Sequence, residues 1–363
     1  MRFNIILLFL LVFNLSCSKR TKYNELDIQA ADNNNTLNVI VLLGDGLGLG
    51  QITAAWYQKD YLHLQDFPYS GLVLTQSSNR FVTESAAANT AMMTGSKTNY
   101  GFLGIDPFEN TLETLYEYTK KQDYKTGIIT TSYMADATLA ALFSHRKDRH
   151  QYEDIILDFY HNYPDFAVAG GQKHFDQRND GRNLLDSLSQ KGVGIFYSLS
   201  QMTTIDKLPA LGMMHESLPP YLSDGRKDFL YQSSQKALDL FADKPFFLFI
   251  EGAHIDKAGH DTNIENQLKE TLEFDKVAGL VLEYAKQHEN TLVVVLSDHE
   301  SGALTLLSGD NFEYTPNYAI DEHSGVMVPV FAYGPGAEEF TGIMDNTDIY
   351  FKIKNLIDHY LNR

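Results

Sequence analysis

The sequence predicts an α/β fold in which a large, mostly parallel sheet is sandwiched between helices. Two observations carry this prediction. Short, apolar, β-rich runs alternate with longer stretches that favour helix, and this alternation is typical of parallel sheets covered on both faces. Hydrophobic residues make up 44% of a 363-residue chain, which is enough to bury one large core.

The predicted elements follow one another with few interruptions. Strands are expected at residues 38–43, 125–130, 246–250, 291–296 and 328–333. Helices are expected at residues 112–121, 151–160, 229–241 and 264–287. Residues 37–363 contain no linker, low-complexity tract, repeat or second long apolar segment. We therefore expect this range to form a single domain.

The chain begins with the layout of a bacterial lipoprotein signal. Arg2 precedes a nine-residue apolar run at residues 5–13, which is too short for a membrane span because a span needs about 20 apolar residues. We expect residues 1–16 to be a signal peptide and residues 17–36 a polar tether, with a lipid anchor on Cys17. The chain would then be exported to the periplasm or outer membrane of a Gram-negative-type bacterium. The alternative is an ordinary signal peptide with an incidental cysteine.

Composition limits the classes of partner. The formal net charge of −18 argues against nucleic acid or an anionic membrane surface as a partner. If the substrate is an anion, bound cations must supply the local attraction. Cys17 is the only cysteine in the sequence, so no disulfide can form within the chain and stability must come from the core.

The candidate nucleophile is Ser85, at the expected start of a helix of small residues. The stretch from Val82 to Gly95 reads VTESAAANTAMMTG, and its alanine-rich part has high helix propensity. The free N–H groups at the start of this helix would face any anion that Ser85 attacks. Taken alone, the stretch also fits a core helix with a serine near its cap.

Polar residues suited to metal or phosphate binding follow the predicted strands. In parallel sheets, sites lie at the carboxyl ends of the strands. Asp45 lies in a glycine turn after the first strand, and this turn lacks the GxGxxG spacing of a dinucleotide site. The run DAT contains Asp136 and Thr138, and the later run HRKDR ends at Arg149. A guanidinium can hold two phosphate oxygens at once.

Three later motifs add carboxylates and imidazoles. They are EGAHIDKAGH, with Glu251, Asp256, Lys257 and His260; SDHE, with Asp298 and His299; and EHSG, with His323. Asp256 and His260 are four residues apart, so one helical turn would place both on one face, where they could share a metal ion. Each motif alone also fits ordinary surface residues.

Together, the motifs closely resemble those of the alkaline phosphatase family. GDG, TESAAANTAMMTG, DAT, HRKDR, EGAHIDKAGH, SDHE and EHSG occur in the family order and cover essentially residues 38–358. The resemblance implies an alkaline-phosphatase-like fold and hydrolysis of small-molecule phosphate monoesters through a phosphoserine on Ser85. It also implies a homodimer.

The same resemblance implies two zinc ions and one magnesium ion per chain. One zinc ion would be held by Asp256, His260 and His323. The other would be held by Asp298, His299 and Ser85, with Asp45 bridging to magnesium. Thr138, Glu251 and, through a water, Asp136 would complete an oxygen-only site that suits magnesium. Arg149 would bind phosphate, and Lys257 would reach it through water and pair with Asp136.

One departure and several alternatives remain open. The family usually has Asp where this chain has Glu84, and the extra methylene is expected to affect the orientation of Arg149. A sulfatase of this superfamily would need a C/S-x-P-x-R motif, whereas Ser85 is followed by three alanines. A phosphodiesterase would usually lack Arg149 and the magnesium site. A non-catalytic metal- or phosphate-binding lipoprotein is the alternative from outside the enzymes.

Overall fold

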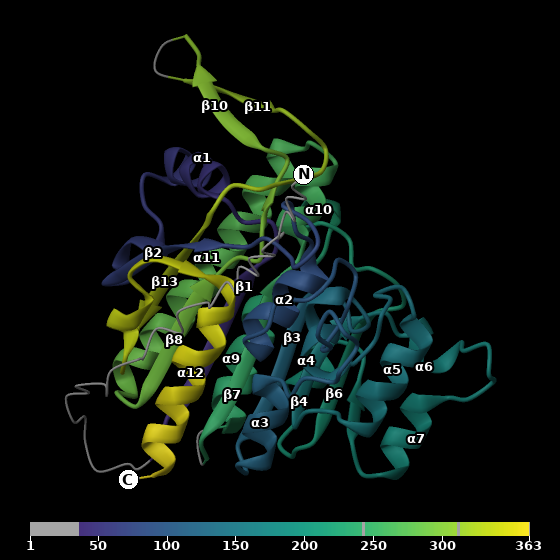
Figure 1. Ribbon diagram of the computed structural model, residues 1–363. Helices are drawn as coiled ribbons and strands as arrows, with labels where there is room; N and C mark the ends of the chain where they lie inside the picture. The colour runs from purple at the N-terminus through teal and green to yellow at the C-terminus, as the bar shows by residue number, and fades with distance from the viewer. Residues whose placement is uncertain (1–35, 242–243, 311–312, 363) are drawn as a thin grey trace, which may run out of the picture.

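The structure is a computed structural model that describes residues 36–241, 244–310 and 313–362. Its centre is a ten-stranded sheet, shown in Figure 1. In spatial order the strands are β14 (Gly342–Asp345), β2 (Tyr69–Leu74), β13 (Val328–Tyr333), β8 (Thr291–Leu296), β1 (Asn38–Gly44), β7 (Phe246–Gly252), β3 (Lys125–Tyr133), β4 (Phe166–Gly170), β6 (Ala210–His215) and β5 (Gly194–Phe196). The predicted α/β fold with a mostly parallel sheet is confirmed. Only β13 pairs antiparallel to its neighbours in this sheet.

The central strand β1 shows why both faces of the sheet are covered. Val39, Val41 and Leu43 belong to one buried cluster, whereas Ile40 and Leu42 belong to another. Since successive side chains of a strand point to opposite faces, an unbroken apolar run needs a helical layer on each side. Helices α2, α4 and α12 lie on one face, and α9 and α11 lie on the other (Figure 1).

The helices of the described chain vary from one turn to more than six turns. They are α1 (Leu49–Lys59), α2 (Ser85–Thr94), α3 (Leu115–Lys121), α4 (Ala137–Phe143), α5 (Tyr152–His161), α6 (Lys173–Asp176), α7 (Leu184–Gln190), α8 (Leu199–Met202), α9 (Phe229–Phe241), α10 (His254–His260), α11 (Ile264–Gln287) and α12 (Asn346–Leu361). No helix in these described ranges is long and apolar enough to cross a membrane.

The helix predicted at 112–121 starts three residues later than expected. Thr114 caps α3 by accepting a hydrogen bond from the Glu117 backbone N–H at 3.1 Å, and the Glu117 carboxylate accepts one from the Thr114 backbone N–H at 3.1 Å. This reciprocal pair fixes the first turn at Leu115. The predicted strands are each present, although β3 and β7 run further than predicted, so Glu251 lies inside β7.

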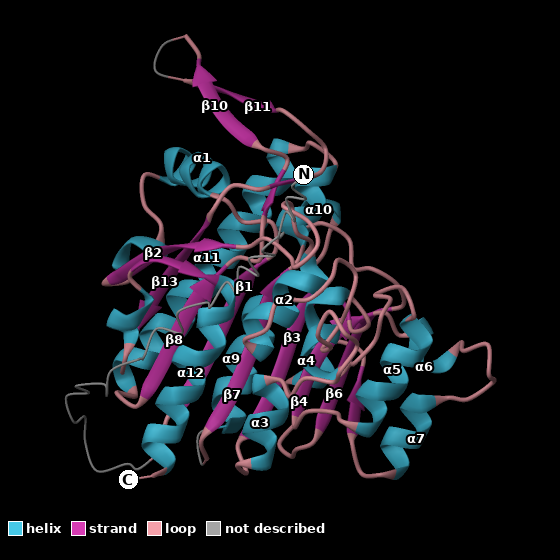
Figure 2. Cartoon of the chain, in the orientation of Figure 1, coloured by secondary structure: helices cyan, strands magenta, loops and turns pink. Residues whose placement is uncertain are grey.

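Two small sheets lie beyond the carboxyl ends of the central strands. One is the hairpin of β10 (Leu304–Ser308) and β11 (Tyr314–Tyr318), which projects from the body in Figure 2. The other pairs β9 (Glu300–Ser301) with β12 (His323–Ser324). The second pairing brings the SDHE and EHSG motifs side by side. The predicted signal peptide, the tether up to residue 35 and Cys17 lie outside the described residues.

Candidate active site

Ser85 is the first residue of α2, as the sequence predicts. Every residue of this helix is buried, and Ser85 itself is 4% exposed. The cap is Glu84, whose carboxylate accepts hydrogen bonds from the backbone N–H groups of Ala86 and Ala87, both at 2.8 Å. Gly95 ends the helix with φ +71°, a conformation that glycine adopts without strain. Because its side chains are small, α2 packs inside the core with its N-terminus at the edge of the sheet.

The first group of metal-ligand side chains, here called the buried cluster, consists of Asp45, Asp298 and His299. Asp45 follows β1, and the other two follow β8. His299 Nε2 lies 3.4 Å from Asp45 Oδ1 and 3.5 Å from Asp298 Oδ2. Ser85 Oγ lies 3.4 Å from the same His299 nitrogen. The three cluster residues converge because β1 and β8 are parallel neighbours that end together, and the start of α2 brings Ser85 to the same place.

Backbone and amide donors hold the buried cluster in place. The Gly46 N–H donates to Asp298 Oδ1 at 3.2 Å, and Asn89 Nδ2 donates to Asp298 Oδ2 at 3.1 Å. Burial raises the pKa of Asp298 to about 7, and burial also raises the pKa of Asp45, with neighbouring carboxylates adding to the effect. Asp45 Oδ1 has no hydrogen-bond partner among the described residues. Buried acids with these properties fit a cation that no side chain supplies.

The second group, here called the open cluster, consists of Asp256, His260 and His323. The first two lie four residues apart on α10, and His323 begins β12. Asp256 Oδ2 lies 3.3 Å from His260 Nε2, and Asp256 Oδ1 lies 3.4 Å from His323 Nε2. The side chain of His260 is 36% exposed. The side chains of His323 and Asp256 are 10% and 15% exposed, so this group reaches solvent mainly through His260, whereas Asp298 and His299 are fully buried.

Main-chain carbonyls orient both imidazoles of the open cluster. His260 Nδ1 lies 2.6 Å from the Asp321 carbonyl oxygen, and His323 Nδ1 lies 3.0 Å from that of Thr83. A carbonyl only accepts, so each Nδ1 carries the proton and each neutral ring presents its lone pair at Nε2. Those two Nε2 atoms are 3.1 Å apart. Two lone pairs and a carboxylate directed at one point fit a shared metal ion.

The two clusters are in contact through rings and backbone. The His299 and His323 rings stack with centroids 3.6 Å apart, and His299 Nδ1 lies 4.0 Å from Asp256 Oδ1. Gly46, at φ +70°, lies between them: a Cβ there would come within 2.8 Å of the Asp256 Cα. Only glycine permits this approach of the turn after β1 to α10.

An oxygen-only group adjoins the buried cluster. Thr138 Oγ1 donates to Asp45 Oδ2 at 3.4 Å. Burial raises the pKa of Glu251 to about 8, and Glu251 Oε1 has no hydrogen-bond partner within the described chain. Thr130 donates to the other Glu251 oxygen, and Ser132 donates to Asp136. These two hydroxyls of β3 thus hold one oxygen of each carboxylate and leave Glu251 Oε1 for another partner.

Arg149 lies between two carboxylates beside the helix start. Its Nη1 pairs with Glu84, and its Nη2 lies 3.4 Å from Asp136 Oδ1. Glu84 also accepts from the Gly101 N–H at 2.9 Å. The longer side chain at position 84 therefore caps α2, fixes the loop at residue 101 and orients the guanidinium at once. This is how the structure accommodates the expected departure from Asp.

Lys257 is placed differently from the prediction. Its ion pair in the described chain is with Asp261, at 3.5 Å, and its ammonium lies 5.6 Å from the centroid of the Tyr221 ring. The expected pair with Asp136 is wrong for this structure, because Arg149 and Ser132 already occupy that carboxylate. The helix α10 directs Lys257 toward its own next turn.

Sequence reasoning missed the residues that support the ligands. Asn89 lies one helical turn after Ser85 and contacts both the Ser85 carbonyl, at 2.9 Å, and Asp298. Thr130 and Ser132 support Glu251 and Asp136. The spacing of Asn89 on the helix that begins at the candidate nucleophile was a usable signal. The two hydroxyls are ordinary β-strand residues, so no local pattern distinguishes them.

With this geometry in view, comparison with known proteins gives one consistent family. The family profile described as alkaline phosphatase matches residues 36–321. The alkaline phosphatase of Escherichia fergusonii is 28% identical to this chain, over 87% of this chain and 85% of that protein.

Solved structures agree. The alkaline phosphatase from the Antarctic bacterium TAB5 superposes with a TM-score of 0.86 at 32% identity and covers 90% of this chain and 99% of its own. A variant of the TAB5 enzyme, with aspartate in place of a histidine and described with Mg bound in the M3 site, gives a TM-score of 0.85 at 32% identity over 89% and 98% of the two chains.

Proposed function

This chain belongs to the alkaline phosphatase family, and from that premise we propose that it hydrolyses phosphate monoesters through a phosphoserine on Ser85, with two zinc ions and one magnesium ion. Family membership makes it a phosphatase, a phosphoric monoester hydrolase. The observation that carries the finer proposal is the convergence of two separate ligand clusters beside one buried serine at a helix start.

The ligand chemistry supports zinc in both clusters. The open cluster offers two imidazole nitrogens and a carboxylate, and the buried cluster offers one imidazole, two carboxylates and the Ser85 hydroxyl. Such mixed nitrogen and oxygen sets, with a position left for substrate or water, suit catalytic zinc. When bound, zinc supplies Lewis acidity that lowers the pKa of a coordinated hydroxyl and neutralises developing negative charge.

Side chains of this protein carry out the two steps of the proposed reaction. Ser85 Oγ gives up its proton and attacks phosphorus, the bond from phosphorus to the leaving oxygen breaks, and phosphoserine forms while the leaving alkoxide takes up a proton and departs as the alcohol. In the second step water attacks the phosphoserine, the bond from phosphorus to Ser85 Oγ breaks, and one water proton restores the Ser85 hydroxyl as inorganic phosphate is released. Arg149, which Glu84 orients, is the group proposed to bind the nonbridging oxygens. His260 is partly exposed, so the leaving alcohol can depart on that side.

The third site is proposed to take magnesium. Asp45, Thr138, Glu251 and, through a water, Asp136 offer only oxygen, which suits an octahedral hard cation. The TAB5 variant that carries aspartate for histidine is described with magnesium in its M3 site. This chain has Asp136 where some relatives carry histidine, which supports the same metal here.

Two alternative functions, a phosphodiesterase and a non-catalytic binding protein, are less well supported. A phosphodiesterase does not need a guanidinium for the extra charge of a monoester, whereas Arg149 is held by two carboxylates. A non-catalytic binding protein would not need a buried nucleophile beside the ligands. The decisive test is hydrolysis of p-nitrophenyl phosphate at pH 9, with and without EDTA, alongside bis-p-nitrophenyl phosphate. Monoester turnover that EDTA abolishes supports the proposal, and faster diester turnover contradicts it.

Two organisational proposals accompany the function. We infer that residues 37–363 form one catalytic domain, supported by a central sheet that takes strands from β1 to β14. We also propose a lipid anchor on Cys17 after removal of residues 1–16, supported by the signal-like layout of the sequence. Membrane fractionation of wild type and Cys17→Ser tests the anchor, and equal retention of both proteins in the membrane fraction would contradict it.

A further inference from the structure

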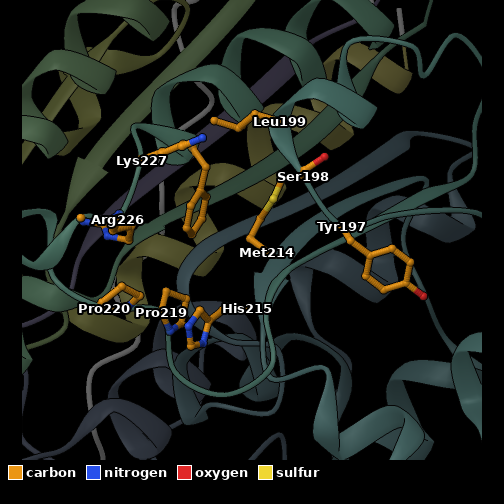
Figure 3. A pocket seen from close by; sticks show the side chains of 11 residues that line it. Tyr197, Ser198, Leu199, Met214, His215, Pro219, Pro220, Arg226 and Lys227 are labelled. Atoms are coloured by element: carbon orange, nitrogen blue, oxygen red, sulfur yellow. The ribbon is translucent and has the colours of Figure 1, made fainter.

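A pocket separate from both ligand clusters lies at the far edge of the sheet. It has a volume of about 260 Å³ and is lined by residues that directly follow β5, by the last two residues of β6, and by residues of the segment 219–229. Figure 3 shows Lys227 and Leu199 on one side of Met214, and Pro219 and His215 on the other. The pocket therefore occupies the carboxyl ends of two parallel strands, the position where open α/β sheets bind ligands.

The floor of this pocket is apolar and firmly held. Phe229 is 4% exposed, and the Arg226 guanidinium lies 5.6 Å from the centroid of its ring. Arg226 in turn pairs with Glu270, and with Glu273 at 2.8 Å. The opposite wall is fixed because His254 Nε2 donates to the Pro219 carbonyl oxygen at 2.7 Å. A pocket with such fixed walls loses little entropy when a ligand enters.

The charge of the lining is opposite to that of the chain. The sequence carries a formal charge of −18, yet the basic residues His215, Arg226 and Lys227 line this pocket, with no carboxylate among the lining residues. Arg226 is already neutralised by its two glutamates. Lys227 is exposed and has no ion pair among the described residues. One ammonium group is thus available at the pocket for an anion.

His215 supplies a second polar contact of known direction. The Ser217 backbone N–H donates to His215 Nδ1 at 3.3 Å. That nitrogen must therefore be unprotonated, and the ring proton lies on Nε2. Nε2 has no hydrogen-bond partner in the described part of the chain, so the imidazole can donate to a ligand acceptor.

We propose that this pocket binds a small organic acid with a flat apolar body. The carboxylate pairs with Lys227, the body contacts Met214 and Phe229, and an acceptor at the other end receives a hydrogen bond from His215. A carboxylate is favoured over a phosphate because the pocket offers one uncompensated cation, which balances a monoanion. The site lies outside the phosphatase chemistry and does not depend on it.

The test measures binding of 4-hydroxybenzoate to the metal-loaded enzyme by ligand-observed NMR and calorimetry. Saturating inorganic phosphate is present so that the catalytic centre is occupied. A ligand of this size is expected to bind with a Kd on the order of 1 mM. Lys227→Gln should weaken binding about tenfold, as expected for loss of a charge-assisted contact. His215→Phe, which keeps a ring and removes the donor, should weaken it about threefold.

Controls separate this site from the catalytic one. Lys207→Gln changes another exposed lysine and should leave the Kd for 4-hydroxybenzoate unchanged. Phenol lacks the carboxylate, so its Kd should be the same for Lys227→Gln and wild type. Ser85→Ala should bind 4-hydroxybenzoate with the same Kd as wild type, because binding at this pocket does not require phosphatase activity. Equal affinity of wild type and Lys227→Gln, or loss of binding when inorganic phosphate is added, would overturn the proposal.

Discussion

The buried cluster and the open cluster use similar ligands in opposite surroundings. Asp298 and His299 are 0% exposed and receive support from the backbone of Gly46 and the amide of Asn89. The side chain of His260 is 36% exposed, and its orientation comes from a loop carbonyl. The buried cluster is thus part of the core, whereas the open cluster lies at the surface. Under the proposed mechanism, the buried side would hold the nucleophile and the open side would exchange groups with solvent.

Removing the nucleophile should have the largest effect. Ser85→Ala should lower kcat for p-nitrophenyl phosphate by at least about 100-fold, because no oxygen remains to form phosphoserine. Ser189→Ala, on an exposed helix turn, is the control and should retain wild-type activity. Acid trapping with ³²P-labelled substrate should label wild type and Ser189→Ala but not Ser85→Ala. Label on Ser85→Ala would place the nucleophile elsewhere.

Changing one imidazole in each cluster tests the comparison directly. His299→Gln leaves Asp45 and Asp298 facing each other in the core, so we expect it to lose bound zinc and to lose at least about tenfold more activity than His260→Gln. Activity of His260→Gln should recover when zinc is added, because its cluster is open. Elemental analysis and zinc titration measure both. Equal loss without recovery in either variant would contradict the distinction.

Arg149 should matter less than the clusters and should show substrate selectivity. Arg149→Ala should lower kcat/KM for monoesters by about 10- to 100-fold, because a charge-assisted contact to phosphate is lost. Diester hydrolysis should fall less. Arg182→Ala removes an exposed arginine and serves as the control. A loss that is equal for both substrate classes would argue against the monoester assignment.

Replacing one ligand of the oxygen-only site should change which metal ion it binds. Asp136→His adds a nitrogen donor, so zinc content should rise from about two to about three per chain while magnesium falls. Stimulation by added magnesium should shrink a few-fold. Asp136→Asn keeps the size of the side chain without imidazole and should not gain zinc. Wild-type protein with three zinc ions and no magnesium, after dialysis against both ions, would rule out the assignment.

A buried carboxylate that belongs to neither cluster should give the smallest effect. Burial raises the pKa of Glu273 to about 7, and an arginine rather than a metal ion lies beside it. The folded state therefore binds a proton more tightly than the unfolded state, so stability should fall as pH rises from about 4.5 to about 7. Glu273→Gln should remove that contribution and shift the pH dependence of Tm by a few degrees. EDTA should not alter this difference, and an unchanged pH slope in the variant would contradict the prediction.

The central strands and the positions of the candidate ligand residues at the sheet edge were predictable because they follow from local patterns. A buried parallel strand is a continuous apolar run, and its neighbours end at the same edge, so the residues after 43, 250 and 296 had to meet. The spacing of Asp256 and His260 fits α10 for the same reason. These inferences needed only chain direction and helix periodicity.

The rest depended on contacts between distant residues. Strand β2 has a largely exposed, mixed burial pattern, so its pairing with β13 has no signature in the sequence. The ion pair predicted between Lys257 and Asp136 does not form, because Arg149 contacts the Asp136 carboxylate instead. Asn89, Thr130 and Ser132 act through tertiary hydrogen bonds, and residue type alone does not reveal such roles.

The close approach at Gly46 has a consequence for how this site can evolve. The turn after β1 rests against the Cα of Asp256, so the spacing between the two clusters is set by backbone packing and not by the length of any ligand side chain. Substitutions among the ligands can change which ion is held, but they leave this spacing intact. A new reaction that required a wider pair of ions would demand a larger residue at position 46 together with movement of α10. Single substitutions around the opening of the site should therefore change which substrates bind more readily than they change the reaction itself.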